Sequence, residues 1–558
     1  MSNKKYSYLL PLIFAIILIA GMQLGYKIRG KTENKMPLFN INKQFNKIDE
    51  ILDFIEVKYV DSVALNDIED QVSRDLMREL DPHSFYISQK ELQSVNENLE
   101  GNFDGIGIEF YILKDTIIVV SPITGGPSET LGIQSGDKII TIEDSIVAGV
   151  GISNREVIHL LRGEKGTTVK VGFMRGRNSE IIEYDITRDK IPITSIEVAY
   201  MVDDEVGYIK ITRFSANTYK EFKKALSMLK GQGMNALILD LRNNPGGYLN
   251  AATMISDEFI DGRKLLVYTE GKAYERQEYT ARVSGLFESE DLVILIDEGS
   301  ASASEILAGA VQDWDRGLII GRRSFGKGLV QEQYELADGS ALRLTVARYY
   351  TPSGRSIQKP YNVDDKASYH REISKRYENG EVFEMTDSLA IQAQDTVRFY
   401  TSNGRPVYSG GGIMPDIIVP IDTADYLIYF SEIRGYIPQF VYDFYSDNQD
   451  RFLPYRDLDY FNNNFMVSEI MYDQFINFIE KEGHRIKEDE LEVLKPQVNI
   501  LIKAHLARQL WKNDGFYPLY NSIDNVFIKA YEIIKGGLQR EYFISELGND
   551  KESKNSKR

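Results

Sequence analysis

The chain of 558 residues contains no cysteine. Disulfides, thiolate metal sites and a cysteine nucleophile are therefore excluded together. Histidine is scarce, with five residues, and none of them has a catalytic motif around it. Proline is also sparse, while 43% of the residues are hydrophobic. This composition provides for several packed domains rather than for extended disorder.

Basic residues are fewer than acidic ones. The chain has 65 Lys and Arg and 83 Asp and Glu, which gives a net charge of −18. A protein that binds nucleic acid needs a basic surface to neutralise phosphates. The sequence shows no dense stripe of Lys and Arg, so we expect no nucleic-acid partner. No metal or cofactor motif stands out, and we expect neither group.

The N-terminal segment has one long uncharged run, Tyr8–Gly25, with the sequence YLLPLIFAIILIAGMQLG. A run of about 18 residues is near the minimum for crossing a bilayer. It is longer than the apolar centre of a usual secretory peptide and has no clear small-x-small cleavage site. We interpret residues 1–30 as an uncleaved signal anchor in the inner membrane, with an extracytoplasmic body on the periplasmic side.

The rest of the chain reads as a multidomain α/β protein. Apolar residues at helical spacing predict an N-terminal helical domain over 40–100. Short strands with glycine turns and one amphipathic helix fill 101–190. Strands rich in Val, Ile and Leu alternate with helices over 191–360, which indicates a layered α/β core.

The second half of the chain is less regular. A polar insertion of low periodicity, 361–398, interrupts the core, and 399–423 returns to it. Helical spacing over 424–545 predicts a C-terminal helical extension. The last segment, 546–558, has the composition of a disordered tail.

The stretch GRRSFGKG, residues 321–328, resembles the phosphate-binding loop GxxxxGK[ST]. That loop passes its lysine to a helix N-terminus and needs Ser or Thr next for Mg²⁺. Gly328 stands there instead, and the following LVQEQYEL alternates like a strand. Lys327 is therefore not expected to bind a nucleotide.

A second segment, IDEGSASASEILAGAVQD at 296–313, predicts a buried strand, a glycine turn and a helix. A serine at such a junction is exposed, and the next backbone amide can stabilise an oxyanion. Ser300, Ser302 and Ser304 compete for this role. Ser302 and Glu305 also have the SxxE spacing of a capping box, so an ordinary helix cap is the alternative.

Lysine can replace histidine as the base for a serine if it is neutral at working pH. Its pKa must fall from about 10.4 to roughly 7 to 8, which burial can achieve. Gln331 lies four residues after Lys327, on the same face of the expected strand. Its amide oxygen would accept a hydrogen bond from the lysine amine.

The segments GIGIEF, SPITGGPSETLGIQSGDKIITI and VIHLLRGEKGTTVKV resemble a circularly permuted bacterial PDZ domain. Such a module adds the last residues of a peptide as an extra strand. The carboxylate-binding loop would be formed by Gly105, Ile106, Gly107 and Ile108. The alternative is that these glycines only make a tight turn.

The segment GSASASEILAGAVQDWDRGLIIGRRSFGKGLVQ resembles the carboxyl-terminal processing peptidases, or tail-specific proteases, a Ser/Lys family with an embedded PDZ domain. LDPHS, LDLRNNPGG, YYTPSGRSIQ and GIMPDIIV extend the resemblance. It implies a crotonase-like or Clp-protease-like α/β protease core. It also implies these roles: Ser302 as nucleophile, Lys327 as general base, Gln331 as its partner, and Ala303 with Gly246 or Gly247 as the oxyanion hole.

The implied function is a serine endopeptidase that cleaves proteins in or near their C-terminal region, after the PDZ domain binds the free C-terminus. A noncatalytic PDZ scaffold is the first alternative, and the intact Ser302, Lys327 and Gln331 argue against it. A crotonase-like acyl-CoA enzyme is the second, and the lack of an evident CoA-phosphate site disfavours it. An adaptor protein and a homo-oligomer are further partners that the sequence leaves open.

Overall fold

The computed structural model describes residues 47–176, 180–362, 365–383, 397–421, 428–484 and 488–537. The expected signal anchor, 1–30, and the expected tail, 546–558, lie outside these residues. Within the described ranges, no helix combines the length and the apolar character that a membrane crossing needs.

The chain divides into two compact units, residues 1–72 and 73–558. The first contains α2 (Lys47–Lys58) and the start of α3 (Leu65–Arg78). Neither helix buries a residue, and the side chains of Phe54 and Val57 are 59% and 70% exposed. The apolar spacing therefore forms helices here without building a core among them.

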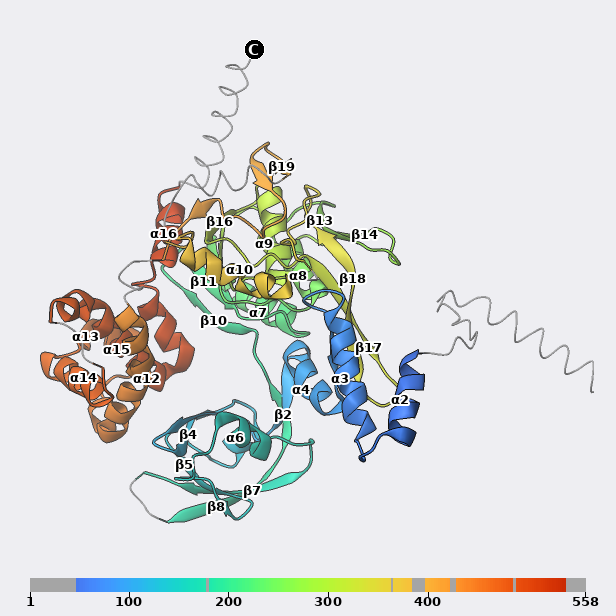
Figure 1. Cartoon of the computed structure of the whole chain (residues 1–558). Coiled ribbons are helices and arrows are strands. Elements are labelled where there is room, and N and C mark those ends of the chain that lie inside the picture. The colour runs from blue at the N-terminus through green and yellow to red at the C-terminus, as the bar shows by residue number, and fades with distance from the viewer. Residues whose placement is uncertain are drawn as a thin grey trace, which may run out of the picture. The chain divides into compact units, whose positions relative to one another are not determined.

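The second unit begins with the rest of α3, followed by β1 (Phe85–Ile87) and α4 (Gln89–Glu100), and continues into a small β domain. Its antiparallel sheet has the order β3-β4-β5-β7-β8, with β6 paired to β5, so β3 is an edge strand. Figure 1 labels β4, β5, β7 and β8 of this sheet. The chain enters and leaves through the pair β2 (Asn102–Gly105) and β9 (Asp189–Pro192). The domain comprises β3 (Ile108–Leu113), β4 (Thr116–Pro122), α5 (Pro127–Thr130), β5 (Lys138–Ile142), β6 (Ser145–Ile146), α6 (Asn154–Leu161), β7 (Thr168–Met174) and β8 (Ile181–Thr187).

The larger domain is built on a six-stranded sheet with the order β10-β11-β12-β15-β16-β21. β10 is antiparallel to β11, and the other neighbours are parallel. The strands are β10 (Ile196–Met201), β11 (Val206–Ile211), β12 (Ala236–Asp240), β15 (Asp291–Ile296), β16 (Leu318–Gly321) and β21 (Ile417–Ile418). The connecting helices are α7 (Thr218–Gly231), α8 (Leu249–Asp257) and α9 (Ala303–Asp313).

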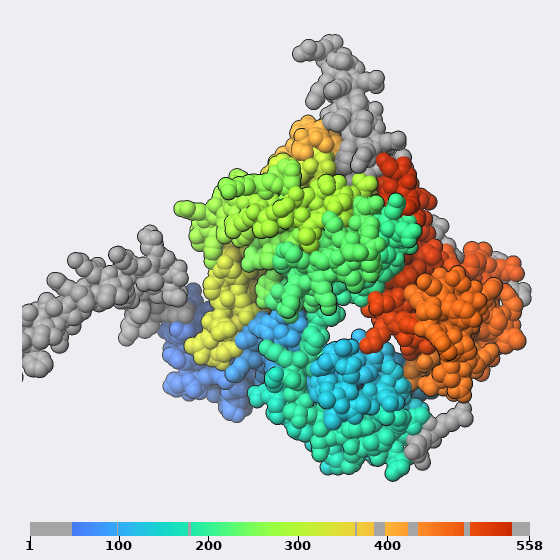
Figure 2. All heavy atoms as spheres, turned by 180° about the vertical axis from the view of Figure 1, so that it is seen from behind, coloured from blue at the N-terminus to red at the C-terminus, as the bar shows by residue number. Residues whose placement is uncertain are grey.

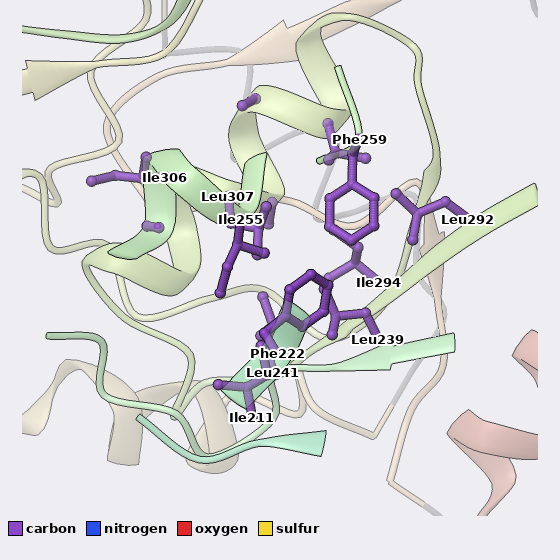
Figure 3. Close-up of a cluster of buried hydrophobic side chains, with 14 of the residues drawn as sticks. Ile211, Phe222, Leu239, Leu241, Ile255, Phe259, Leu292, Ile294, Ile306 and Leu307 are labelled. Carbon is purple, nitrogen blue, oxygen red and sulfur yellow. The ribbon is translucent and has the colours of Figure 1, made fainter. Parts of the chain in front are cut away.

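Successive side chains of each strand point to opposite sides of the sheet. Both faces carry buried side chains. On one face Leu239 and Ile294 pack against α7, α8 and α9, as Figure 3 shows for Phe222, Ile255 and Leu307. On the other face Ile238 and Val293 pack against α16 (Asn525–Lys535), which is drawn in red beside β16 in Figure 1. In Figure 2 the red atoms of the C-terminal part lie against the green atoms of the core. The predicted C-terminal extension therefore supplies one layer of the core.

A second sheet has the strand order β1-β18-β13-β14, with β17 paired to β18. Its remaining strands are β13 (Leu265–Glu270), β14 (Gln277–Thr280), β17 (Leu329–Glu335) and β18 (Ala341–Tyr350), and a separate pair is formed by β19 (Arg398–Tyr400) and β20 (Pro406–Tyr408). The polar insertion contains a helix, α10 (Lys366–Glu378), that its low periodicity did not indicate. Polar contacts fix it, since Arg376 Nη1 donates to the carbonyls of Arg323 and Ser324, at 2.9 Å each.

The helices before α16 form a separate cluster with an aromatic core. They are α12 (Ile428–Asp447), η3 (Gln449–Arg451), α13 (Leu458–Asn464), α14 (Glu469–Lys481) and α15 (Glu488–Tyr520). We call α12 to α15 the helical region. Phe440, Phe461 and Phe475 are buried in its centre. The helix α15 bends at Trp511 and Lys512, whose backbone angles are not helical.

The packing of α16 predicts the effect of Phe527→Ala. Phe527 is 5% exposed against the sheet, so its removal should cost about 3–5 kcal/mol of stability. Urea unfolding measures the loss, and hydrogen exchange of the β12 and β15 amides locates it in the core sheet. Lys529→Ala on the exposed face of α16 is the control, with an expected change within about 0.5 kcal/mol. Equal stability of Phe527→Ala and the parent would contradict this role of α16.

Candidate functional site

The predicted catalytic residues meet where neighbouring parallel strands end. The loops that follow β12, β15 and β16 all leave the carboxyl edge of the sheet, which is where α/β sheets bind their ligands. A cavity of about 800 Å³ opens there. Its lining includes Ser302, Lys327, Gln331, Gly246, Gly247 and Arg343.

Ser302 precedes the first residue of α9 and has an unusual backbone, with φ 55° and ψ −112°. Ordinary N-cap residues are extended, and a positive φ at a non-glycine residue costs about 1–3 kcal/mol. The Ser302 N–H donates to Glu305 Oε2 at 2.8 Å, so part of the capping pattern is present. The strain goes beyond what a cap requires, and it turns the side chain toward the cavity.

The two neighbouring serines are engaged elsewhere. Ser300 Oγ donates to the carbonyl of Leu241 at 2.9 Å, and Ser304 Oγ donates to that of Asn244 at 3.0 Å. Both serines are fully buried, whereas Ser302 is partly exposed. Of the three, Ser302 is therefore the one that can meet a substrate.

Lys327 reaches the cavity from the loop between β16 and β17. Its Nζ donates to Gln331 Oε1 at 2.8 Å, and Gln331 Nε2 donates to the carbonyl of His83 at 2.5 Å. Burial lowers the pKa of Lys327, and the charge of Arg343 lowers it further. Glu305 and Asp81 oppose this shift. The net direction is the one that a lysine base requires.

The serine and lysine side chains share the cavity without a direct hydrogen bond. The described residues include none between Ser302 Oγ and Lys327 Nζ, although both atoms belong to residues that line the same space. Catalytic hydrogen bonds are often long without substrate and shorten when it binds. The geometry is therefore compatible with a pair that closes around a substrate.

A buried carboxylate joins the serine turn to the lysine loop. Glu305 Oε2 accepts from the Ser302 and Lys327 backbone N–H groups, at 2.8 Å each. Its Oε1 accepts from Ser324 Oγ at 2.5 Å and from the Gly326 N–H at 2.7 Å. Burial raises the pKa of Glu305 to about 7 against the effect of these hydrogen bonds. One side chain thus sets the spacing of both predicted catalytic residues.

Two aromatic residues brace the same loops. The buried Tyr349 hydroxyl contacts the carbonyls of both Ser302 and Lys327. Tyr369, from α10 of the insertion, lies 2.7 Å from His83 Nε2. Burial lowers the pKa of His83 to about 4, so its ring is neutral, and its contribution to the lysine site is the backbone carbonyl.

The loop NNPGG presses against the start of α9. A Cβ on Gly246, whose φ is 94°, would lie 2.8 Å from the Ala303 nitrogen, so only glycine fits there. The Gly246 N–H donates to Asn244 Oδ1 at 2.9 Å. The N–H groups of Ala303 and Gly247 have no acceptor among the described residues.

The predicted peptide loop lies at a different cavity, of about 550 Å³, along β3 and α6. Ile106, Gly107 and Ile108 line it, while Gly105 ends β2. The carbonyl of Ile106 accepts from Ser128 N at 3.2 Å and from Ser128 Oγ at 2.6 Å. Gly107 has φ 75°, which glycine adopts without strain. The loop is thus fixed by its own domain and open toward the groove.

Sequence reasoning assigned no role to His83, Tyr349 or Tyr369, and treated Glu305 only as a cap partner. His83 and Tyr349 lie in LDPHS and YYTPSGRSIQ, the motifs that carried the family resemblance. That signal marked both positions as important without indicating their contacts.

The role of Glu305 is tested by Glu305→Gln. Only one oxygen of glutamine can accept, so two of the four hydrogen bonds are lost. We expect kcat to fall about 100-fold because the serine and lysine loops shift, with KM nearly unchanged. Steady-state cleavage of a peptide substrate measures both constants. Glu332→Gln, on the strand that follows Lys327, is the control and should leave both constants unchanged. A Glu305→Gln variant with parental kcat would rule out the positioning role.

Peptidase family S41 matches residues 205–366, and the PDZ domain matches residues 105–186. A family of unknown function (DUF8443) matches residues 429–512.

Two relatives are about one third identical to this chain over the aligned regions. The carboxy-terminal-processing protease of Bartonella bacilliformis is 33% identical over 323 residues, covering 57% of this chain and 74% of that protein. The carboxy-terminal processing protease CtpA of Bacillus subtilis is 34% identical over 319 residues, covering 57% of this chain and 67% of that protein. A solved photosystem II D1 C-terminal processing protease is 31% identical with a TM-score of 0.34, covering 56% of this chain and 83% of that one.

These matches confirm the predicted combination of an α/β protease core, a PDZ domain and a C-terminal helical region. They also confirm that the chain is an enzyme, so the scaffold and acyl-CoA alternatives are set aside. The chain belongs to peptidase family S41 and is a serine protease of the carboxy-terminal processing type.

Proposed function

We propose that Ser302 is the nucleophile, that Lys327 is its general base, and that Gln331 orients the lysine amine. The observation that carries this assignment is the hydrogen bond from the partly buried Lys327 to Gln331, beside the strained and partly exposed Ser302. The lowered pKa of Lys327 supports it further.

The proposed reaction proceeds through an acyl-enzyme. Neutral Lys327 takes the Ser302 hydroxyl proton as the oxygen attacks the scissile carbonyl, and then gives that proton to the leaving amine. A water molecule later attacks the ester, with Lys327 again accepting a proton and returning it to Ser302. The Ala303 and Gly247 N–H groups would hold the oxyanion. We prefer Gly247 over Gly246 as the second oxyanion donor, because the Gly246 N–H already donates a hydrogen bond to Asn244 Oδ1.

The PDZ domain would bind the free C-terminus of the substrate. β3 is an edge strand beside an apolar groove, so a peptide can extend the sheet. The loop Gly105–Ile108 would take the terminal carboxylate. The proposed substrates are therefore proteins with an apolar C-terminus, which are cut in or near their C-terminal region.

We also propose that residues 1–30 anchor the protease in the inner membrane with its body on the periplasmic side. The uncharged run Tyr8–Gly25 supports this location. An adaptor protein and self-association remain hypotheses from the sequence.

The catalytic assignment predicts that Ser302→Ala and Lys327→Ala each lower kcat by about 10⁴-fold or more. The assay uses an unfolded protein with an apolar free C-terminus, and mass spectrometry of the fragments follows cleavage. Ser289→Ala and Lys264→Ala, both outside the cavity, are the matched controls and should cleave like the parent. Cleavage at parental rate by either catalytic variant would disprove the pair.

The lysine base also predicts a pH dependence. Only neutral Lys327 can accept a proton, so kcat should fall as pH drops below its pKa. Gln331→Glu places a negative charge beside the amine and raises that pKa, which should move the acidic limb of the profile upward by about one pH unit or more. Gln331→Met keeps the size without the charge and should not move the limb upward. If the two variants give the same limb, a group other than Lys327 titrates.

A further inference from the structure

The groove of the PDZ domain has a second wall that comes from the helical region. β3 and α6 form one side of the cavity of about 550 Å³, and α12 and α15 form the other. The helices contribute Pro438, Tyr442, His505, Arg508 and Gln509. Ligand sites commonly measure about 300–1,000 Å³, so the space is large enough for a peptide tail.

Direct contacts hold α12 against the far end of β3. The ring of Tyr442 packs edge-on against Tyr111, with centroids 5.0 Å apart. Lys114 Nζ lies 3.3 Å from Asp443 Oδ2. Leu113 and Tyr442 belong to one small buried cluster. The second wall is thus attached to the strand that would receive the peptide.

The direction of β3 decides which part of a peptide meets the helices. β3 runs from Ile108 to Leu113, away from the Gly105–Ile108 loop. A peptide that pairs antiparallel with β3 and leaves its carboxylate at that loop runs along β3 toward Tyr111. Its residues upstream of the C-terminus then lie beside α12 and α15.

Arg508 gives this wall its charge. The side chain is exposed and lines the groove, and it forms no ion pair within the described part of the chain. Its guanidinium lies 5.6 Å from the centre of the Phe516 ring. The other arginine of the groove, Arg162, is paired with Glu97. Glu109 also lines the groove and accepts from Ser121 Oγ at 3.2 Å.

We propose that the helical region is the second half of the substrate-tail site and that Arg508 binds an acidic side chain upstream of the substrate's C-terminus. This inference rests on the PDZ role proposed above. The terminal carboxylate goes to the Gly105–Ile108 loop, which leaves Arg508 for a second carboxylate. Arginine binds carboxylates through two parallel hydrogen bonds. A pair between Arg508 and a substrate carboxylate would therefore distinguish apolar tails that carry an acidic residue from those that do not. The protease then prefers tails that carry a Glu or Asp before the apolar end.

The test measures peptide binding to the full chain carrying Ser302→Ala, so that the peptide is not cleaved. The probe is a fluorescein-labelled decapeptide with an apolar C-terminus and one Glu upstream, and fluorescence polarisation gives Kd. Arg508→Ala should weaken binding about tenfold. Arg451→Ala, an exposed arginine of the helical region outside the groove lining, is the control and should keep the parental Kd. With a Gln in place of the peptide Glu, the parent and Arg508→Ala should bind equally.

Ile158→Glu separates this inference from the PDZ role, because Ile158 lines the groove from α6 and is 39% exposed. If Ile158→Glu weakens binding while Arg508→Ala does not, the second wall is rejected and the PDZ role stands. If the effect of Arg508→Ala persists with the Gln peptide and disappears with a C-terminal amide, Arg508 binds the terminal carboxylate, which contradicts the proposal. A parent that binds no peptide would reject both the PDZ role and this inference.

Discussion

The proposed active site depends on one buried carboxylate. Glu305 accepts four hydrogen bonds that come from the serine turn and from the lysine loop. Neither loop has regular structure, so this carboxylate and the Tyr349 hydroxyl keep their spacing. The sheet brings the two loops to one edge, and Glu305 joins them there.

This arrangement is costly for folding. The pKa of Glu305 rises from 4.5 to about 7 on burial, so the folded state binds the proton more tightly than the unfolded state. The contribution of this carboxyl to the stability of the fold is therefore fully present below pH 4.5. It is lost as pH rises through 7. The free energy of unfolding is therefore about 3 kcal/mol lower at neutral pH than at acidic pH, as far as this carboxyl contributes to it. The backbone strain at Ser302 adds to that cost. The apolar layers on both faces of the sheet offset the two together.

The sequence predicted those parts of the site that local patterns determine. The strand after Lys327, the turn before α9 and the spacing of Lys327 and Gln331 all follow from short segments. The His83 carbonyl and Tyr369 could not be predicted, because they reach Lys327 through contacts between distant segments. The helix α10 was missed for a related reason, since Arg376 fixes it through polar contacts rather than through an apolar stripe.

The position of α16 links the timing of synthesis to assembly of the core. Strand β16, the parallel neighbour of β15, ends at Gly321, and α16 begins at Asn525, 204 residues later. At about 5–20 residues per second, roughly 10–40 s of translation separate the two. During that interval the sheet face around Ile238 and Val293 lacks its cover. The sheet that carries the serine and lysine loops therefore receives the apolar layer on this face only after α16 has been made.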